Sequence, residues 1–159
     1  MNYKLLALGG DGIGPEVLES GLSILEAISK KNNLNFEISF DLIGGTCWDK
    51  YGTFCRNSTI EKAIESDAIL VGAVGGHKWD AMKIKGDPEE QDGLMCLRKK
   101  LGAFFGIRPA KNYKSLQNII PFNKEYVQNS EIIILREMCG GVMFSKPRGL
   151  KILENDKRY

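Results

Sequence analysis

The sequence predicts an α/β fold, because segments patterned like buried strands alternate with segments patterned like amphipathic helices. The clearest strand covers residues 68–74, a continuous apolar and β-branched run of the kind found in central parallel strands. The clearest helix begins at Pro15 and Glu16, because proline suits the first turn and an acid suits the positive end of the helix dipole. Together these signals favour a parallel sheet covered by helices.

The remaining elements of the first half follow from periodicity. Residues 3–8 form an apolar run that ends in two glycines, which predicts a buried strand. Residues 36–42 alternate between apolar and polar, as in a half-exposed strand with Phe36, Ile38, Phe40 and Leu42 on its apolar face. A capping box at 58–61 predicts the start of a short helix. The apolar face of the helix after Pro15 should consist of Val17, Gly21, Ile24, Leu25 and Ile28.

The pattern changes after Gly75. Residues 76–92 form a polar loop with several charges, and a helix is predicted over 93–101, with its leucines on one face. Two further strands are predicted at 103–109 and 131–135, separated by a stretch that lacks clear periodicity. We therefore expect the second half to differ in architecture from the first.

Composition argues against several functional classes. The chain has 22 basic and 20 acidic residues, a net charge of +2, so no general basic field exists for nucleic acid or a membrane surface. No apolar run approaches the roughly 20 residues of a membrane span. The four cysteines lie far apart without a C-x-x-C pair, which favours scattered reduced thiols over structural zinc. With one histidine, His77, chemistry that needs two imidazoles is excluded.

Two glycine segments are candidate ligand sites. Residues 9–16 place glycines between a strand and a helix start, an arrangement suited to an anionic or ribose ligand, although a tight structural turn explains it equally well. Gly75 and Gly76 follow the apolar strand, and ligands of open α/β sheets collect at the carboxyl ends of strands. The competing interpretation of His77 and Trp79 is a packed loop.

Three arginines suggest an acidic ligand. Arg98, Arg108 and Arg136 each end or follow an apolar stretch. A single arginine is most often a surface charge, but several guanidinium groups can hold a dicarboxylate in one orientation through bidentate hydrogen bonds. The three positions therefore favour a small dicarboxylate substrate.

The motifs occur together in one order. They are Gly-Asp-Gly-Ile-Gly-Pro-Glu at 10–16, Gly-Gly-His-Lys-Trp-Asp at 75–80, Gly-Leu-Met-Cys-Leu-Arg-Lys at 93–99, Ile-Arg-Pro-Ala-Lys at 107–111, Arg-Glu at 136–137 with Gly-Gly at 140–141, and Lys-Pro-Arg-Gly at 146–149. In this order and spacing they resemble the isocitrate/isopropylmalate dehydrogenase family of decarboxylating dehydrogenases, and its isopropylmalate-oxidising members most closely. Each motif is weak alone, but the set is specific and spans essentially the whole chain.

The resemblance implies a two-domain fold that is truncated here. Residues 1–100 would form a first α/β domain that lacks its returning strands. Residues 101–159 would begin a second, dimer-forming domain with a subunit-contacting arm. Family chains are about twice as long. The family's catalytic lysine and metal-binding aspartates would lie beyond Tyr159, so the resemblance implies no metal ligands and no complete catalytic set in this chain.

The resemblance also implies site residues. Arg98, Arg108 and Arg136 would bind the carboxylates and hydroxyl of the substrate, and Leu94 and Met95 would line the pocket for an isopropyl group. The residues that would contact the cofactor are Ile13, Gly75, Gly76, His77, Lys78, Trp79, Asp80 and Gln91.

The implied reaction is NAD-dependent oxidation of a 2-hydroxyl, followed by loss of the β-carboxylate assisted by Mg²⁺ or Mn²⁺. It would belong to leucine biosynthesis in the cytoplasm, with a small-molecule substrate and a homodimeric enzyme. Two alternatives stay open. One is a related decarboxylating dehydrogenase acting on isocitrate, homoisocitrate, tartrate or malate, of which the apolar pair Leu94 and Met95 disfavours isocitrate. The other is a non-catalytic truncated paralogue.

Four positions depart from the family pattern. Met143 stands where the family has a tyrosine, and a thioether cannot donate a proton. Gln91 replaces a glutamate of the cofactor loop, which removes a negative charge near the nicotinamide. Gly106 replaces an asparagine before the second arginine, and Gly9 replaces a proline. The first two departures weaken the case for catalysis.

Residues 1–159 expressed alone should show no measurable dehydrogenase activity. The implied metal ligands and proton-accepting lysine are absent, and a positioned general acid alone typically contributes about 10²–10⁴-fold. The measurement is NADH absorbance with isopropylmalate, NAD and magnesium. Turnover above the protein-free control by a monodisperse product would overturn this expectation.

Overall fold

The computed structural model describes residues 2–82, 92–138, 140–141 and 145. Gln91 and Met143, both singled out in the sequence, lie outside the described residues. Contacts within the chain divide it into two compact units, Met1–Gly102 and Ala103–Tyr159, and each is described by itself.

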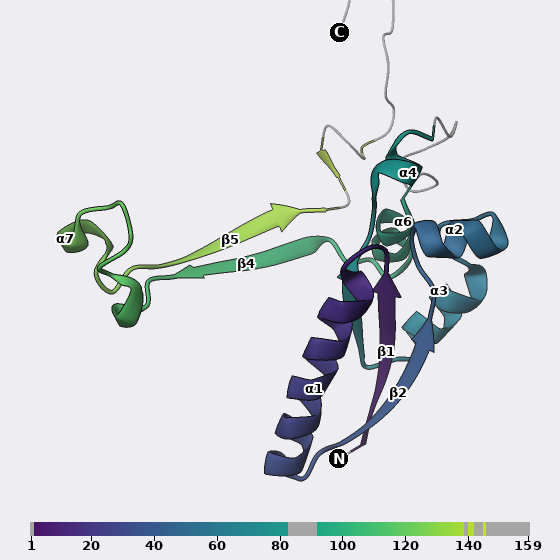
Figure 1. The fold of residues 1–159 in the computed structure, drawn as a ribbon, viewed down its shortest axis with the longest axis horizontal. Coiled ribbons are helices and arrows are strands. Elements are labelled where there is room, and N and C mark those ends of the chain that lie inside the picture. The colour runs from purple at the N-terminus through teal and green to yellow at the C-terminus, as the bar shows by residue number, and fades with distance from the viewer. Residues whose placement is uncertain (1, 83–91, 139, 142–144, 146–159) are drawn as a thin grey trace, which may run out of the picture. The chain divides into compact units, whose positions relative to one another are not determined.

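The first unit is built on a parallel sheet. Its three strands are β1 (Asn2–Gly10), β2 (Asn35–Asp41) and β3 (Ala68–Ala73), in the order β2-β1-β3. Its helices are α1 (Gly14–Asn32), α2 (Gly45–Tyr51), α3 (Asn57–Ile64), α4 (His77–Asp80) and α6 (Gly93–Lys100), as Figure 1 shows. The predicted α/β class is therefore confirmed. The strand predicted at 68–74 is present as β3 and is parallel, as expected, but in the described residues it lies at the edge of the sheet, because β1 is hydrogen-bonded on both sides and β3 on one.

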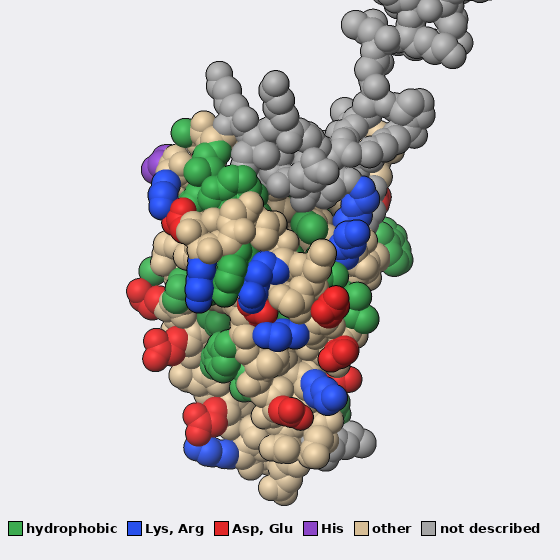
Figure 2. Space-filling view, turned by 90° about the vertical axis from the view of Figure 1, so that its right-hand side faces the viewer, with side chains coloured by type: hydrophobic (Ala, Val, Ile, Leu, Met, Phe, Trp, Pro, Cys, Tyr) green, Lys and Arg blue, Asp and Glu red, His purple; other side chains and the backbone are tan. Residues whose placement is uncertain are grey.

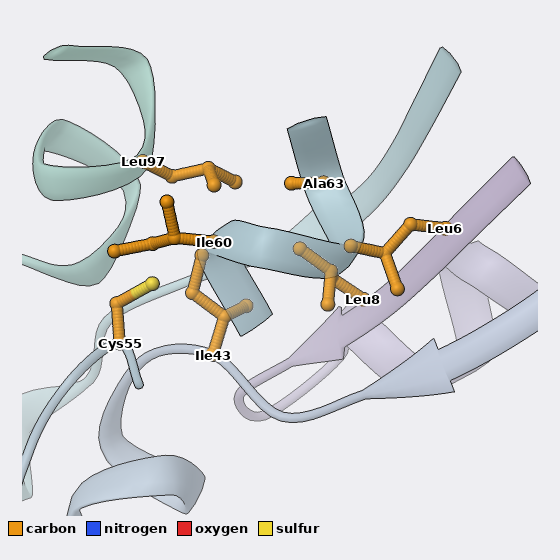
Figure 3. Packing of buried hydrophobic residues seen from close by; sticks show 7 residues of the cluster. All are labelled: Leu6, Leu8, Ile43, Cys55, Ile60, Ala63 and Leu97. Carbon is orange, nitrogen blue, oxygen red and sulfur yellow. The ribbon is translucent and has the colours of Figure 1, made fainter. Parts of the chain in front are cut away.

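Strand β1 is buried on both faces. Its residues 5–8 are nearly inaccessible, so side chains of both orientations are covered. Leu6 and Leu8 point into a core that also contains Ile43, Cys55, Ile60, Ala63 and Leu97, seen in Figure 3. Leu5 and Ala7 alternate with them and point to the opposite face, where α1 contacts β1 and β3. The sheet is therefore sandwiched between α1 and the α3–α6 layer.

Helix α1 begins as predicted, but of the predicted apolar face only Leu25 is even half-buried. Leu18 is buried, and Leu22 and Leu25 are half-buried on the same side. Val17 and Ile24, predicted to face the core, are 50% and 64% exposed. The two apolar rows are neighbours on the helix surface, and 3.6-residue spacing identifies both without deciding which one meets the sheet.

The capping box predicted at 58–61 is wrong. Helix α3 begins one residue before it, at Asn57, and no side chain is bonded at its N-cap residue Arg56. The carbonyl of Arg56 accepts from the amides of Thr59 and Ile60, which fixes the first turn and leaves Ser58 inside the helix. Helix α6 carries the side-chain cap instead: Asp92 accepts from the amides of Leu94 and Met95 at 2.8 and 3.2 Å.

The second unit is a two-stranded antiparallel sheet. Strand β4 (Phe105–Lys111) pairs with β5 (Glu131–Glu137) from Phe105↔Glu137 to Lys111↔Glu131. Their connection contains η1 (Lys114–Leu116) and α7 (Lys124–Val127). Its two ends are tied where Asn112 Nδ2 donates to the Val127 carbonyl at 2.6 Å. Every residue of β5 is exposed within the unit.

The surface carries mixed charge. On the face drawn in Figure 2, basic and acidic side chains are interspersed, and no extended area of one sign dominates. Of the helices that the structure describes, none combines the length and apolar character needed to span a membrane.

At the end of β2, Asp41 turns inward. Its side chain is 3% exposed and accepts hydrogen bonds from Arg56, from Lys62 Nζ at 2.9 Å and from the Leu42 amide at 2.8 Å. The alternation expected over 36–42 thus breaks at its end, because Phe40 is exposed and Asp41 is not. Burial acts to raise the pKa of Asp41, but the hydrogen bonds from Lys62, Leu42 and Arg56 outweigh it and hold that pKa below its usual value.

We expect Asp41→Asn to make the free energy of unfolding fall less steeply as the pH is lowered. A carboxyl whose folded-state pKa lies below the ordinary 3.8 stabilises the fold above that value, and this contribution is lost as pH falls through the folded-state pKa. Urea midpoints followed by tryptophan fluorescence between about pH 6 and pH 2 measure this. Glu26→Gln, which removes an exposed carboxylate paired with Lys30, should change the slope much less. Parallel curves for Asp41→Asn and the wild type would contradict the assignment.

Candidate functional site

The candidate site lies at the carboxyl edge of the parallel sheet. Because β1, β2 and β3 run in one direction, the segments that leave them meet at the same edge. These segments are the glycine turn after β1, the link from β2 to α2, and the segment from Val74 into α4. Two of the three are the glycine segments recognised in the sequence.

Asp11 joins these segments. Its side chain is almost fully buried, at 1% exposure, and its carboxylate accepts three backbone hydrogen bonds. Oδ1 accepts from the Thr46 amide at 2.7 Å, and Oδ2 accepts from the amides of Gly45 at 2.8 Å and Gly75 at 2.9 Å. The Asp11 amide donates to the Ala73 carbonyl at 2.6 Å. One residue therefore holds together the segments that follow all three strands.

The carboxylate also complements the start of α2. Gly45 and Thr46 are the first two residues of that helix, where amides lack intrahelical partners and the dipole is positive. Asp11 thus occupies the position that a ligand anion takes at many helix N-termini. Gly44, the N-cap, has φ +82°, and a Cβ there would overlap Asp11 Oδ2, so only glycine fits.

A second close approach places the indole of Trp79. A Cβ on Gly45 would lie inside the Trp79 ring system, so the ring packs directly on the backbone of α2. Trp79 lies in α4, three residues after the N-cap Gly76, and the amides of Trp79 and Asp80 donate to the Gly76 carbonyl at 2.9 and 3.0 Å. The segment after β3 is therefore folded onto α2 rather than extended away from it.

These contacts enclose a cleft of about 250 Å³. It is lined by Asp11, Gly45, Phe54, Val74, Gly75, Trp79, Asp80, Met82, Asp92 and Gly93. Complete ligand pockets usually measure about 300–1,000 Å³, so the cleft has room for part of a dinucleotide. Three lining residues, Gly75, Trp79 and Asp80, belong to the cofactor segment expected from the sequence.

The other residues expected to contact a cofactor are more open. Ile13 is 58% exposed beside the glycine turn. His77 and Lys78 are exposed on α4, and Gly76 is half-buried at its start. These four residues are not among those that line the cleft, although each is next in sequence to, or within two residues of, a lining residue.

The residues expected to bind substrate fall in both units. Leu94, Met95 and Arg98 are half-buried on α6 in the first unit, directly after the cleft residues Asp92 and Gly93. Arg108 and Arg136 belong to the second unit.

Arg108 and Arg136 share one face of the two-stranded sheet. Arg136 is opposite Gly106, and Arg108 is opposite Ile134, so the two arginines are diagonal neighbours on paired strands. Diagonal neighbours on one face lie within about 7–8 Å, close enough for both guanidinium groups to bind one small dianion. Glycine at 106 leaves Arg136 without a bulky partner across the strand, and the Met138 side chain fills that space instead.

Thiol and metal chemistry find little support in the described residues. Burial, followed by the neighbouring thiols of Cys96 and Cys47, raises the pKa of Cys55 to about 12, and burial also raises the pKa of Cys47. Neither is a thiolate near neutral pH. Within the described residues, no three His, Cys, Asp or Glu side chains gather to hold a metal ion.

Sequence reasoning missed two members of the site. The sequence indicates Asp11 only as part of a glycine turn, and it gives no prediction for Gly45. The signal for Asp11 was an acid flanked by glycines at a strand end, but its partners lie 34 to 64 residues away. The signal for Gly45 was the Gly44-Gly45 pair before a short helix.

The fold and site match a known family. The isocitrate/isopropylmalate dehydrogenase family pattern matches residues 4–158, and the chain belongs to this family. The resemblance inferred from the motifs is thus confirmed. The chain is similar to the 3-isopropylmalate dehydrogenases of Hydrogenovibrio crunogenus, at 41% identity over 158 residues, and of Pseudomonas fluorescens, at 42%. These alignments cover 99% of this chain but 44% and 43% of the relatives, so the chain spans less than half their length.

Solved structures show the same fold. A β-decarboxylating dehydrogenase from Thermococcus kodakarensis matches 99% of this chain and 40% of its own, with a TM-score of 0.61 at 24% identity. The isocitrate dehydrogenase of Methylococcus capsulatus matches 86% of this chain and 34% of its own, with a TM-score of 0.65 at 18% identity.

Asp11→Asn should lower the free energy of unfolding of the first unit by about 2–3 kcal/mol, because a buried charged acceptor of three amides becomes a neutral group that also carries donors. Urea unfolding followed by tryptophan fluorescence measures this, since Trp48 and Trp79 both lie in this unit. The control is Asp67→Asn, an exposed carboxylate that accepts only the Lys4 amide and should cost below about 1 kcal/mol. Equal losses in both variants would refute the role of Asp11.

Proposed function

We propose that this chain supplies the cofactor cleft and the substrate arginines of an NAD-dependent dehydrogenase that oxidises and decarboxylates 3-isopropylmalate, in cytoplasmic leucine biosynthesis. The observation that carries the proposal is the placement of Arg108 and Arg136 on one face of paired strands, which suits a dianionic substrate. The identity of about 41% to 3-isopropylmalate dehydrogenases supports the choice of substrate.

Each residue has a definite task in this proposal. Arg98, Arg108 and Arg136 are assigned to the carboxylates and the hydroxyl of the substrate, which guanidinium groups bind through charge-assisted hydrogen bonds. Leu94 and Met95 accommodate the isopropyl branch by apolar contact. The Gly75–Asp80 segment and Ile13 hold the dinucleotide, together with Gln91. When bound, the dinucleotide accepts the hydride from the 2-hydroxyl carbon.

The proton transfers and the metal lie outside what the described residues supply. Two carboxylates that line the cleft are already engaged, since Asp11 accepts three amides and Asp92 caps α6, and the third, Asp80, belongs to the proposed cofactor segment. By the family resemblance, a bound Mg²⁺ or Mn²⁺ would supply a Lewis acid for the carbonyl, and the longer enzyme would be a homodimer.

A non-catalytic role is the second candidate function. It is favoured by Met143 in place of a proton-donating tyrosine and by Gln91 in place of a glutamate. A related substrate is the other alternative. The apolar pair Leu94 and Met95 disfavours isocitrate, whose third carboxylate would need a cation or hydroxyl there, but only weakly disfavours tartrate or malate.

The decisive experiment grafts residues 1–159 onto the remainder of the Hydrogenovibrio crunogenus 3-isopropylmalate dehydrogenase, in place of its aligned segment, and follows NADH production. We expect turnover of 3-isopropylmalate, and Arg108→Ala should lower kcat/KM by the equivalent of about 2–5 kcal/mol through the loss of a charge-assisted contact. Lys111→Ala is the matched control, because Lys111 is exposed three residues further along β4 and forms only a long ion pair with Glu131.

Met143→Tyr in the same graft separates the two candidate functions. Activity in the unmodified graft supports the enzyme. Activity only after Met143→Tyr supports a binding site that has lost its proton donor. Absence of activity in both grafts contradicts the proposed function, as does an Arg108→Ala variant with unchanged kinetics.

A further inference from the structure

Asp49 contacts two consecutive residues of the cofactor segment. It lies on α2, and its Oδ2 accepts from Lys78 Nζ at 2.6 Å while its Oδ1 accepts from Trp79 Nε1 at 3.2 Å. The Lys78 ammonium lies 5.2 Å from the centroid of the Trp79 ring. These contacts join α2 to α4 across 29 and 30 residues of sequence.

Gly45 and Asp49 form one socket for Trp79. They are four residues apart in the same helix, so they lie on one face of α2. The body of the indole packs where a Cβ of Gly45 would be, and its N–H is bonded to Asp49. Packing on Gly45 therefore fixes the plane of the ring, and the hydrogen bond to Asp49 fixes how the ring is turned within that plane.

The position of Trp79 shapes the cleft. Trp79 and Gly45 both line it, and the neighbouring Gly75 and Asp80 complete the same wall. Asp11 fixes the beginning of this segment at Gly75, and α4 contains only four residues, so its far end needs a separate anchor. Asp49 is the anchor that the structure provides.

The pair is too exposed to matter much for global stability. The side chains of Lys78 and Asp49 are 62% and 40% exposed, and ion pairs of this kind contribute little to folding. The contact instead acts on Trp79, which lines the cleft, and on Lys78 next to it in sequence. Its effect should therefore appear in the local geometry of the segment and in ligand binding.

We propose that Asp49 is a positioning residue for the dinucleotide: it holds Trp79 in the cleft wall through the indole N–H and holds Lys78 beside it. This rests on the proposed function, since it assumes that the cleft binds the cofactor. Asp49 does not touch the cofactor in this assignment and acts through Trp79.

The first test needs no cofactor. In ¹⁵N-labelled protein the two tryptophans give two indole N–H signals, and Trp48→Phe identifies that of Trp79. Asp49→Ala should shift the Trp79 signal upfield and increase its exchange with solvent by roughly tenfold, because the hydrogen bond is lost. Glu26→Ala is the matched control, an exposed carboxylate with a lysine partner at the same 2.6 Å on α1, and should leave the signal unchanged. An unchanged Trp79 signal in Asp49→Ala would overturn the proposal.

The second test measures the NADH affinity of residues 1–159 joined to the remainder of the Hydrogenovibrio crunogenus enzyme, by fluorescence titration in a double-mutant cycle in which the unmodified graft is the wild type. Asp49→Ala should weaken binding roughly three- to tenfold in the wild type, and the loss should largely disappear in a Trp79→Phe background, which keeps a ring without the N–H. If Asp49→Ala weakens NADH binding as much in the Trp79→Phe background as in the wild type, Asp49 does not act through Trp79 and the inference is rejected. If the wild type binds no NADH, the proposed function and the cofactor part of this inference both fail, whereas the indole signal decides the positioning contact independently.

Discussion

The buried carboxylate of Asp11 is the constraint on which the arrangement of the first unit depends. Three amides from two distant segments converge on its two oxygens, at a position that water hardly reaches. Buried backbone donors must be satisfied, so the start of α2 and the turn at Gly75 have to meet around this one side chain. The cleft exists because these segments are drawn together, and Gly44 and Gly45 permit the close approach from the side of α2.

The elements themselves could be predicted from local sequence, because proline, glycine and apolar periodicity act within a few residues. β1, α1, α6 and both strands of the second unit lie where the pattern indicated. The capping box at 58–61 failed for a local reason, because Arg56 is the N-cap of α3, but the other failures depended on partners far along the chain. The row of α1 that meets the sheet is chosen by β1 and β3, and Asp41 turns inward because Arg56 and Lys62 lie 15 and 21 residues further on.

The candidate site, like the fold, could be predicted from the sequence only in part. The segment at 75–80 and the three arginines were visible as motifs, and strand pairing explains why Arg108 and Arg136 share a face. The contributions of α2 were not visible, because nothing local marks Asp49 or Gly45 as neighbours of Trp79. The first glycine turn, which precedes α1, also supplies the Asp11 carboxylate that complements the start of α2.

The long reach of the Asp11 contacts has a consequence for the order of folding. Its partners lie 34, 35 and 64 residues downstream, so the contact with Gly75 closes a large loop and bears a correspondingly large entropic cost. Because the ribosome adds about 5–20 residues per second, Gly75 is synthesised several seconds after Asp11. During that interval β1 can pair with β2 but not with β3, and one apolar edge stays open. The cleft is therefore assembled last in its unit, and the nascent chain is most exposed to misassociation just before its candidate site forms.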